Sequence, residues 1–196
     1  MQKNVLITNM ESDFGKDLAA VFRREGYEVF APADLDKIDR LDFFAETTDF
    51  WDASDCFSVM SGIKPYIIER IFRENVLVPM HNTEQVLPLL MAGEIRRMFY
   101  VSSAEASINE SRTNRGFAYK MSKTALHQFL QMKRNELAPL GFTFRIFDPR
   151  PAMSDSAAES AFLYITRRRG TENHDPARDD ETRLSLMDSN GRHHAW

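Results

Sequence analysis

The chain has 196 residues, of which 43% are hydrophobic and 28% are charged. This composition suits one globular domain and excludes a disordered or collagen-like chain. The net charge of −4 does not favour a nucleic-acid-binding surface, and a single cysteine, Cys56, excludes an internal disulfide. Because there is no leader-like segment and no run of about 18 apolar residues, we expect a cytoplasmic protein without a membrane contact.

Glycine is scarce in this chain. There are 8 glycines in 196 residues, about 4% against an average near 7%. Since glycine lets a backbone approach a phosphate closely, this shortage bears on any nucleotide site.

The first half of the chain alternates strands and helices. We expect strands at residues 5–8, 28–31 and 41–45, and helices at 14–24 and 65–90. Strand, helix and strand within about 30 residues form a βαβ unit, which favours a parallel sheet. Pro79 and Pro88 predict a break, kink or cap within the second helix.

The second half continues the alternation. We expect strands at 97–102, 142–147 and 183–187, helices at 117–137 and 157–168, and polar loops at 104–116 and 170–181. The predicted fold class is α/β: one Rossmann-like domain over residues 1–196, with a doubly wound parallel sheet of about six strands.

Three side chains form a candidate catalytic cluster. Tyr119 and Lys123 are four residues apart and so share one face of the predicted helix, where a cation favours the phenolate. Ser103 follows a strand, at the sheet edge where α/β proteins bind ligands. A Tyr–Lys pair alone is also common on helix surfaces.

The combination of motifs resembles the short-chain dehydrogenase/reductase family over most of residues 4–196. The motifs are the opening at 5–15, the helix around Asn75 and Pro79, the run 101–103, the run 119–126 and the pair Asp148-Pro149. The loop 106–108 and the ending 188–196 look most like the C-factor-like subgroup of that family.

The resemblance implies roles for these residues. Tyr119 would donate and accept the proton, Lys123 would lower the pKa of Tyr119 and hold the nicotinamide ribose, and Ser103, with Ser102 as an adjacent possibility, would orient the carbonyl. Asn75 would support a water-mediated proton relay, or would instead satisfy the kink near Pro79. The implied reaction is reversible hydride transfer between NAD or NADP and a carbonyl or alcohol substrate.

The implied cofactor site departs from the family pattern. Its residues would be Thr8, Asn9, Ser12, Phe14, Gly15, Asp34 and Ser154, together with Tyr119 and Lys123. Of the three glycines usual in the phosphate-binding turn only Gly15 is present, since Asn9 and Asp13 replace the others. Asp13 brings a negative charge toward the phosphates, or else caps the helix with no ligand.

Two more segments differ from the family. About ten residues join the second and third predicted strands, where the family has a helix, a strand and a helix, and residues 44–47 replace its Asn-Asn-Ala-Gly. Pro149-Arg150 replaces a Pro-Gly pair. Asp34, just after the second strand, favours NAD over NADP because a carboxylate repels the additional phosphate.

Two functions therefore compete. The first is a nicotinamide-dependent oxidoreductase, expected as a homodimer or homotetramer through the helices at 65–90 and 117–137, without nucleic acid, membrane or bound metal. The second is a binding or signalling scaffold with an impaired active site. The retained cluster favours the first function, and Asn9, Asp13 and the shortened segment favour the second.

Overall fold

The computed structural model describes residues 2–57, 60, 62, 64–150, 155–167 and 184–195. Its strands are β1 (Asn4–Ile7), β2 (Glu28–Phe30), β3 (Phe43–Glu46), β4 (Arg97–Val101), β5 (Thr143–Asp148), β6 (Leu186–Asp188) and β7 (His193–His194). Its α-helices are α1 (Asp13–Arg24), α2 (Pro65–Phe72), α3 (Val78–Ala92), α4 (Phe117–Leu137) and α5 (Asp155–Thr166).

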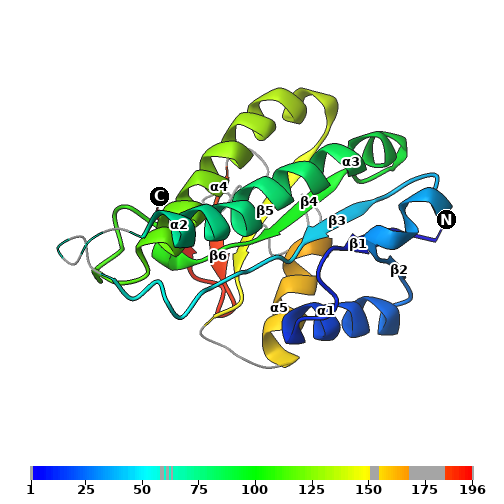
Figure 1. The fold of residues 1–196 in the computed structure, drawn as a ribbon. Coiled ribbons are helices and arrows are strands. Elements are labelled where there is room, and N and C mark those ends of the chain that lie inside the picture. The colour runs from blue at the N-terminus through cyan, green and yellow to red at the C-terminus, as the bar shows by residue number, and fades with distance from the viewer. Residues whose placement is uncertain are drawn as a thin grey trace.

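The strands form one seven-stranded sheet in the order β2-β1-β3-β4-β5-β6-β7 (Figure 1). All neighbouring pairs are parallel except β6 with β7, which is antiparallel. The predicted α/β class with a doubly wound parallel sheet is confirmed. The strand beyond the expected six is the two-residue β7, which was too short to leave a pattern in the sequence.

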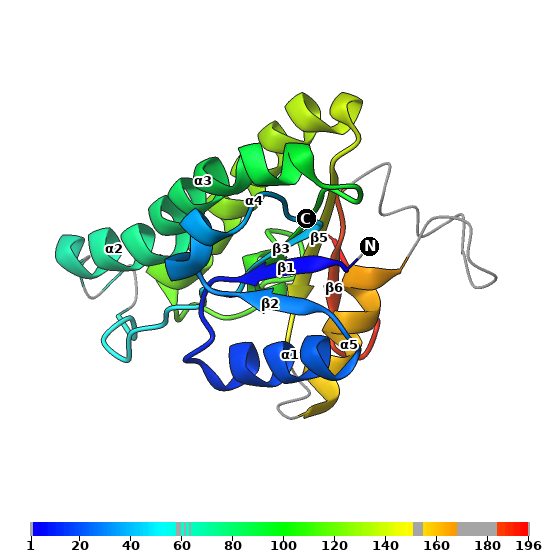
Figure 2. The same cartoon turned by 90° about the vertical axis from the view of Figure 1, so that its right-hand side faces the viewer.

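Helices cover both faces of the sheet. Figure 2 shows α1 and α5 on one side and α2, α3 and α4 on the other. Across the strands, Leu6 pairs with Phe44 and Phe44 with Met98, and these three side chains belong to the core under α3 and α4. The next residues along the strands, such as Ala45 and Phe99, belong to the opposite core. The alternation follows from the two-residue period of a strand.

The connection from β2 to β3 is as short as the sequence predicted. Only the 3-10 helix Pro32–Lys37 lies between the two strands, and β2 is the last strand on that side of the sheet. The carboxyl ends of β1 and β3 therefore lie where the strand order reverses, the usual ligand-binding position of an open α/β sheet.

The break that was expected in the helix at residues 65–90 is a local change from α-helical to π-helical hydrogen bonding. A π-helical segment, Arg73–Leu77, joins α2 to α3 without interruption. Pro79 lies in the first turn of α3, and its ring cannot donate a hydrogen bond. Such a bulge is a common response to a disturbed ladder of backbone bonds.

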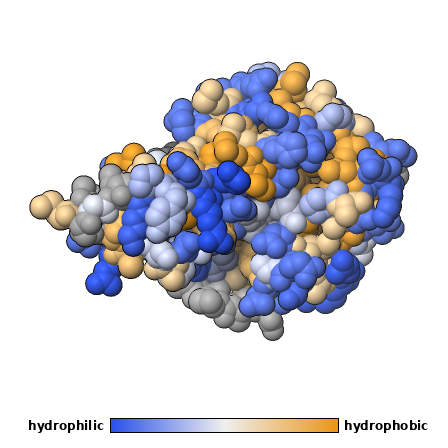
Figure 3. Space-filling model, in the orientation of Figure 1, coloured by the Kyte–Doolittle hydropathy of each residue, from blue (hydrophilic) through white to orange (hydrophobic). Residues whose placement is uncertain are grey.

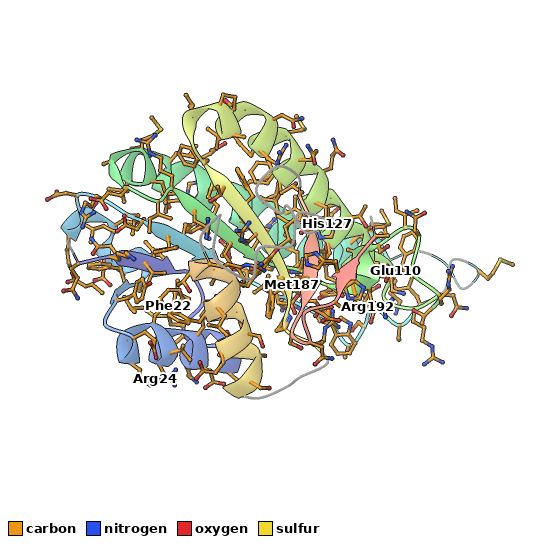
Figure 4. All side chains as sticks on the ribbon, turned by 180° about the vertical axis from the view of Figure 1, so that it is seen from behind. Phe22, Arg24, Glu110, His127, Met187 and Arg192 are labelled. Atoms are coloured by element: carbon orange, nitrogen blue, oxygen red, sulfur yellow. The ribbon has the colours of Figure 1, made fainter. Side chains whose placement is uncertain are left out.

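The C-terminal hairpin is tied to the loop after β4 through one histidine. The His194 ring contacts Glu110 Oε2 through Nδ1 at 2.8 Å and Asp188 Oδ2 through Nε2 at 3.0 Å. The backbone amide of Ala195 also donates to Glu110. Figure 4 shows Glu110 and Arg192 beside the two C-terminal strands, and their charged groups lie 3.8 Å apart.

The contacts of His194 with Glu110 and Asp188 predict a loss of stability as the pH rises above about 6.5. Burial alone would lower the pKa of His194, but Glu110 and Asp188 outweigh it and hold that pKa above its ordinary value. A raised folded-state pKa means that charged His194 stabilises the fold below about pH 6.5, and that this contribution disappears as pH rises through the folded pKa. Urea unfolding above about pH 6.5 should show the decline in the wild type and not in His194→Gln, with exposed His81→Gln as the control. An equal decline in His194→Gln would contradict the assignment.

The outer surfaces of the long helices carry apolar side chains. Leu77 on the π segment is 58% exposed, and Met91 on α3 is 42% exposed. On α4, Met121 is 42% exposed and Met132 is 63% exposed. Figure 3 shows apolar patches among polar ones on the face that carries α2 and α3. Within the described residues, no helix is both long and apolar enough to cross a membrane.

Candidate active site

Tyr119 is placed by the start of α4. Gly116, with a φ of 69°, precedes the helix, and Asp55 reaches over from the loop after β3 to its first turn. The Asp55 carboxylate accepts the backbone N–H groups of Ala118 at 3.1 Å and Tyr119 at 2.8 Å. A carboxylate in this position satisfies amides that the helix leaves unpaired and fixes the direction in which Tyr119 projects.

Tyr119 and Lys123 meet at a third residue, Asp49. The Tyr119 hydroxyl donates to Asp49 Oδ1 at 2.8 Å, and Lys123 Nζ lies 2.9 Å from the same oxygen. Lys123 is fully buried and also donates to the carbonyl oxygens of Thr48 at 3.2 Å and Val101 at 3.4 Å. The predicted Tyr–Lys pair is thus joined by a carboxylate that the sequence analysis did not identify.

Asp49 changes the expected electrostatics of Tyr119. The pKa of Tyr119 lies well above its ordinary value, because burial opposes the phenolate and the Asp49 carboxylate repels it. The expectation that Lys123 lowers this pKa stays a prediction, and in this arrangement Lys123 Nζ is paired with the Asp49 carboxylate.

Ser103 lies two residues after β4 and is fully buried. Its hydroxyl oxygen accepts from the backbone amide of Glu105 at 3.0 Å and from the guanidinium of Arg150. Arg150 also lies over the Tyr119 ring, with Cζ 5.9 Å from the centroid, and pairs with Asp148 at 3.2 Å. The hydroxyl hydrogen of Ser103 is left to donate to a carbonyl oxygen.

Ser102, the other candidate for orienting the carbonyl, is hydrogen-bonded to a histidine in the core. Ser102 Oγ lies 2.6 Å from His127 Nε2 in the core beside α4. Burial, with a smaller effect of the Lys123 charge, lowers the pKa of His127 to about 3, so the ring is neutral. The geometry therefore favours Ser103 over Ser102 as the carbonyl-orienting group.

Asn75 lies in the π segment, where it holds the loop that carries Asp49. Its side chain donates to the backbone oxygen of Phe50 at 2.8 Å and accepts from the Phe50 amide at 2.8 Å. It also donates to Ser122 Oγ at 3.1 Å. The side chain thus joins α4 to the residue after Asp49, and the proposed proton-relay role of Asn75 stays a prediction.

The turn after β1 is bound to the end of β3. The Thr8 hydroxyl donates to Glu46 Oε1 at 2.7 Å, and the Asn9 amide donates to Thr47 Oγ1 at 3.1 Å. Apart from glycines, only Arg96 has a positive φ among the described residues, so Asn9 stands in place of a glycine without adopting the left-handed conformation. Phe14 stacks on Phe147 with ring centroids 6.2 Å apart.

Ser12, not Asp13, caps α1. Its hydroxyl accepts from the Gly15 amide at 3.1 Å and donates to the Asn9 carbonyl at 2.9 Å. The suggestion that Asp13 is the cap is therefore wrong, since Asp13 is the first helical residue and is exposed. Together with exposed Glu11, it puts negative charge at a helix N-terminus suited to a phosphate.

Asp34 lies in the short helix after β2, as expected. Its carboxylate accepts from the Ala31 amide at 3.1 Å and pairs with Lys37 Nζ at 2.7 Å. The Lys37 ammonium holds the pKa of Asp34 below its usual value. The remaining candidate, Ser154, lies outside the described residues.

A cavity of about 590 Å³ opens beside Tyr119. Asp49, Trp51, Arg115 and Arg150 are among the residues that line it. The segments after β3, β4 and β5 therefore meet the start of α4, where Asp49 joins Tyr119 to Lys123 and Arg150 contacts Ser103 and the Tyr119 ring.

Asp49 belongs to no motif in the sequence, and Arg150 stands out there only as a departure from the Pro-Gly pair. The position of Asp49 carried a signal, since it closely follows a buried strand and the carboxyl ends of parallel strands meet at the ligand-binding edge. No spacing rule, however, relates Asp49 to Tyr119, because 70 residues separate them.

No family model matches the chain. In sequence it is similar to a protein named C-signal from Myxococcus xanthus, at 32% identity over 94 residues, and to an uncharacterized oxidoreductase of Saccharomyces cerevisiae, at 34% over 84 residues. These matches cover 48% and 43% of this chain and span 57% and 33% of the two relatives.

In structure the chain is similar to an NADPH-bound carbonyl reductase from chicken fatty liver, with a TM-score of 0.77, 12% identity and coverage of 100% and 99% of the two chains. It is also similar to a carbonyl reductase from Pseudomonas aeruginosa in complex with NADP, with a TM-score of 0.73, 15% identity and full coverage of both chains. At these identities, the structural likeness establishes a shared fold.

Proposed function

This chain is a short-chain dehydrogenase/reductase by fold, and from that premise we propose that it is an oxidoreductase of this type. It would reduce a small carbonyl compound, or oxidise the corresponding alcohol, with NAD or NADP as cofactor. The observation that carries the proposal is that Tyr119 and Lys123 meet at Asp49 while Arg150 contacts both Ser103 and the Tyr119 ring, beside a cavity that Tyr119 and Arg150 line.

The residues divide the work as follows. Ser103 donates its hydroxyl hydrogen to the carbonyl oxygen of the substrate and holds it near the Tyr119 hydroxyl. Tyr119 transfers its proton to that oxygen as the alcohol forms. Arg150, next to both, stabilises negative charge that develops on the oxygen. A bound nicotinamide supplies the hydride.

The chain fits a nicotinamide dinucleotide better at one end than at the other. Lys123 and Tyr119 suit the nicotinamide ribose, and the N-terminus of α1 lies close to Asn9 in the turn after β1 because residue 15 is glycine. At the same helix end, Asp13 opposes the phosphates. Asp34 would bind the ribose hydroxyls of NAD, while Lys37 pairs with Asp34 rather than serving a 2′-phosphate.

Calorimetric titration of the protein with NADH and with NADPH tests this proposal. We expect binding of at least one reduced cofactor, with NADH the tighter, and reduction of simple aldehydes and ketones followed by loss of nicotinamide absorbance. Absence of binding by both cofactors at millimolar concentration would overturn the proposed function.

The negative charge at the start of α1 gives a related prediction. Asp13→Asn removes the charge at the first helical residue of α1 and should tighten cofactor binding about 2- to 5-fold at low salt, the range for one charge at a helix terminus. Asp17→Asn, one turn further along the same helix, serves as the control and should change binding less. Equal affinities of the Asp13→Asn variant and the wild type would place the phosphates away from this turn.

A second candidate is a binding or signalling scaffold that uses the fold without turnover. The negative charge of Glu11 and Asp13 at the phosphate-binding turn and the sequence similarity to C-signal favour it. The same titration separates the candidates, since a scaffold of this kind needs no nucleotide. In either case we propose that the exposed apolar residues of α3 and α4 pack against a second copy of the chain.

A further inference from the structure

Asp49 is the acidic side chain that the proposed chemistry does not use. Its Oδ1 accepts the Tyr119 hydroxyl at 2.8 Å and lies 2.9 Å from Lys123 Nζ. It is therefore bonded to both members of the pair on which proton transfer depends. About a third of the Asp49 side chain, 32%, is exposed, and the residue lines the cavity beside Tyr119.

The loop that carries Asp49 is held on both sides. On one side, the Thr48 amide donates to Glu46 Oε1 at 3.0 Å, and the Thr48 carbonyl accepts from Lys123. On the other, both backbone polar groups of Phe50 bond the side chain of Asn75 at 2.8 Å. The carboxylate is thus fixed by bonds to β3, α4 and the π segment, and its contact with Tyr119 is built into the fold.

We propose that Asp49 is a positioning residue that holds Tyr119 as a neutral phenol by accepting its O–H hydrogen, so that Tyr119 is kept in the proton-donor form that carbonyl reduction requires. This inference rests on the proposed oxidoreductase function. In that direction the substrate carbon gains a hydride from the reduced nicotinamide and the substrate oxygen gains the Tyr119 proton, so the carbonyl becomes an alcohol. The phenolate left behind recovers a proton from water, for which the exposed edge of Asp49 is the route.

The charges around Tyr119 support this assignment. Asp49 comes from the loop after β3, Lys123 from the helix of Tyr119 itself, and further charges lie nearby on other segments: Asp55, Glu105, Asp148 and Arg150. Arg150 favours the phenolate but is paired with Asp148, and Lys123 is paired with Asp49. Removing the Asp49 charge therefore releases Lys123 to act on Tyr119.

The test is the ionisation of Tyr119 itself, read from tyrosinate absorbance after rapid pH jumps. The chain has 5 tyrosines, so the signal of Tyr119 is the difference between each protein and the same protein carrying Tyr119→Phe. We expect no Tyr119 ionisation in the wild type up to about pH 11. In Asp49→Asn, the acid dissociation constant of this phenol should rise about 10-fold or more, because an uncompensated cation within a few ångströms favours the phenolate.

Two further variants keep the result decisive. Asp52→Asn removes an acid of the same loop, one that contacts Ser54 and Arg70, and should leave Tyr119 unchanged. Adding Lys123→Met to Asp49→Asn should reverse the rise, since the released cation is then gone. Circular dichroism confirms that each variant is folded, and Asp49→Gly replaces Asp49→Asn if the latter does not fold.

Equal ionisation of Tyr119 in the wild type and in Asp49→Asn overturns the proposal, as does a wild-type Tyr119 that ionises near neutral pH. Neither result depends on nucleotide binding, so failure of this inference is distinguishable from failure of the proposed function. If the enzyme turns over, the pH at half-maximal alcohol oxidation should also fall in Asp49→Asn and stay unchanged in Asp52→Asn.

Discussion

Tyr119→Phe should reduce the turnover number by about 100- to 10,000-fold, the usual contribution of a positioned acid or base. The change removes one oxygen atom from a side chain that is 4% exposed, and that oxygen bonds Asp49. The ring still fills its place in α4 beside Arg150. Stopped-flow or steady-state reduction of a ketone, followed at the nicotinamide absorbance, measures the effect.

The affinity for reduced cofactor should change little in Tyr119→Phe, because Lys123 and the N-terminus of α1 are intact. Tyr66→Phe is the matched control, since Tyr66 is 67% exposed on α2 and should leave turnover unaltered. A Tyr119→Phe enzyme with wild-type turnover would remove Tyr119 from the mechanism. Loss of cofactor binding together with turnover would instead indicate a structural role.

The fold could be predicted from the sequence because its evidence is local. Apolar runs such as residues 5–7 and 97–101 formed buried strands, and helical spacing placed α1 and α4 within a few residues of their observed bounds. The element that the sequence did not predict, β7, makes its contacts with residues that include a distant one in the sequence, Glu110. β7 pairs with β6 and its His194 contacts Glu110 and Asp188, and a two-residue strand has no periodicity to detect.

The site divides in the same way. Tyr119 and Lys123 are four residues apart on one helix, so their proximity follows from helical geometry. Asp49 and Asp55 reach α4 from a loop 63 to 70 residues away in sequence, a separation that no spacing rule covers. The Asp49 carboxylate, which repels the Tyr119 phenolate, therefore had no signal in the sequence that connected it to Tyr119.

Gly15→Ala should lower the free energy of unfolding by about 3 kcal/mol, the upper part of the usual range for overpacking. A Cβ at this position would lie 1.9 Å from the backbone oxygen of Asn9 and 2.9 Å from Ser12 Oγ. Neither the turn nor the cap can yield easily, because Ser12 bonds both Asn9 and Gly15. Such a loss is a large share of the roughly 5 to 15 kcal/mol that stabilises an ordinary domain.

The sign of the Gly15→Ala effect separates two physical terms. Gly15 is a helical residue of α1, and alanine is more favourable than glycine inside a helix by about 1 kcal/mol, so propensity alone predicts stabilisation. The contact with Asn9 predicts the opposite. Urea unfolding of Gly15→Ala beside Lys16→Ala, an exposed neighbour expected to change stability by less than about 0.5 kcal/mol, measures the difference. A stabilised Gly15→Ala would mean that α1 can move away from the turn after β1, and Gly15 would then not be required for the close approach of the helix and that turn.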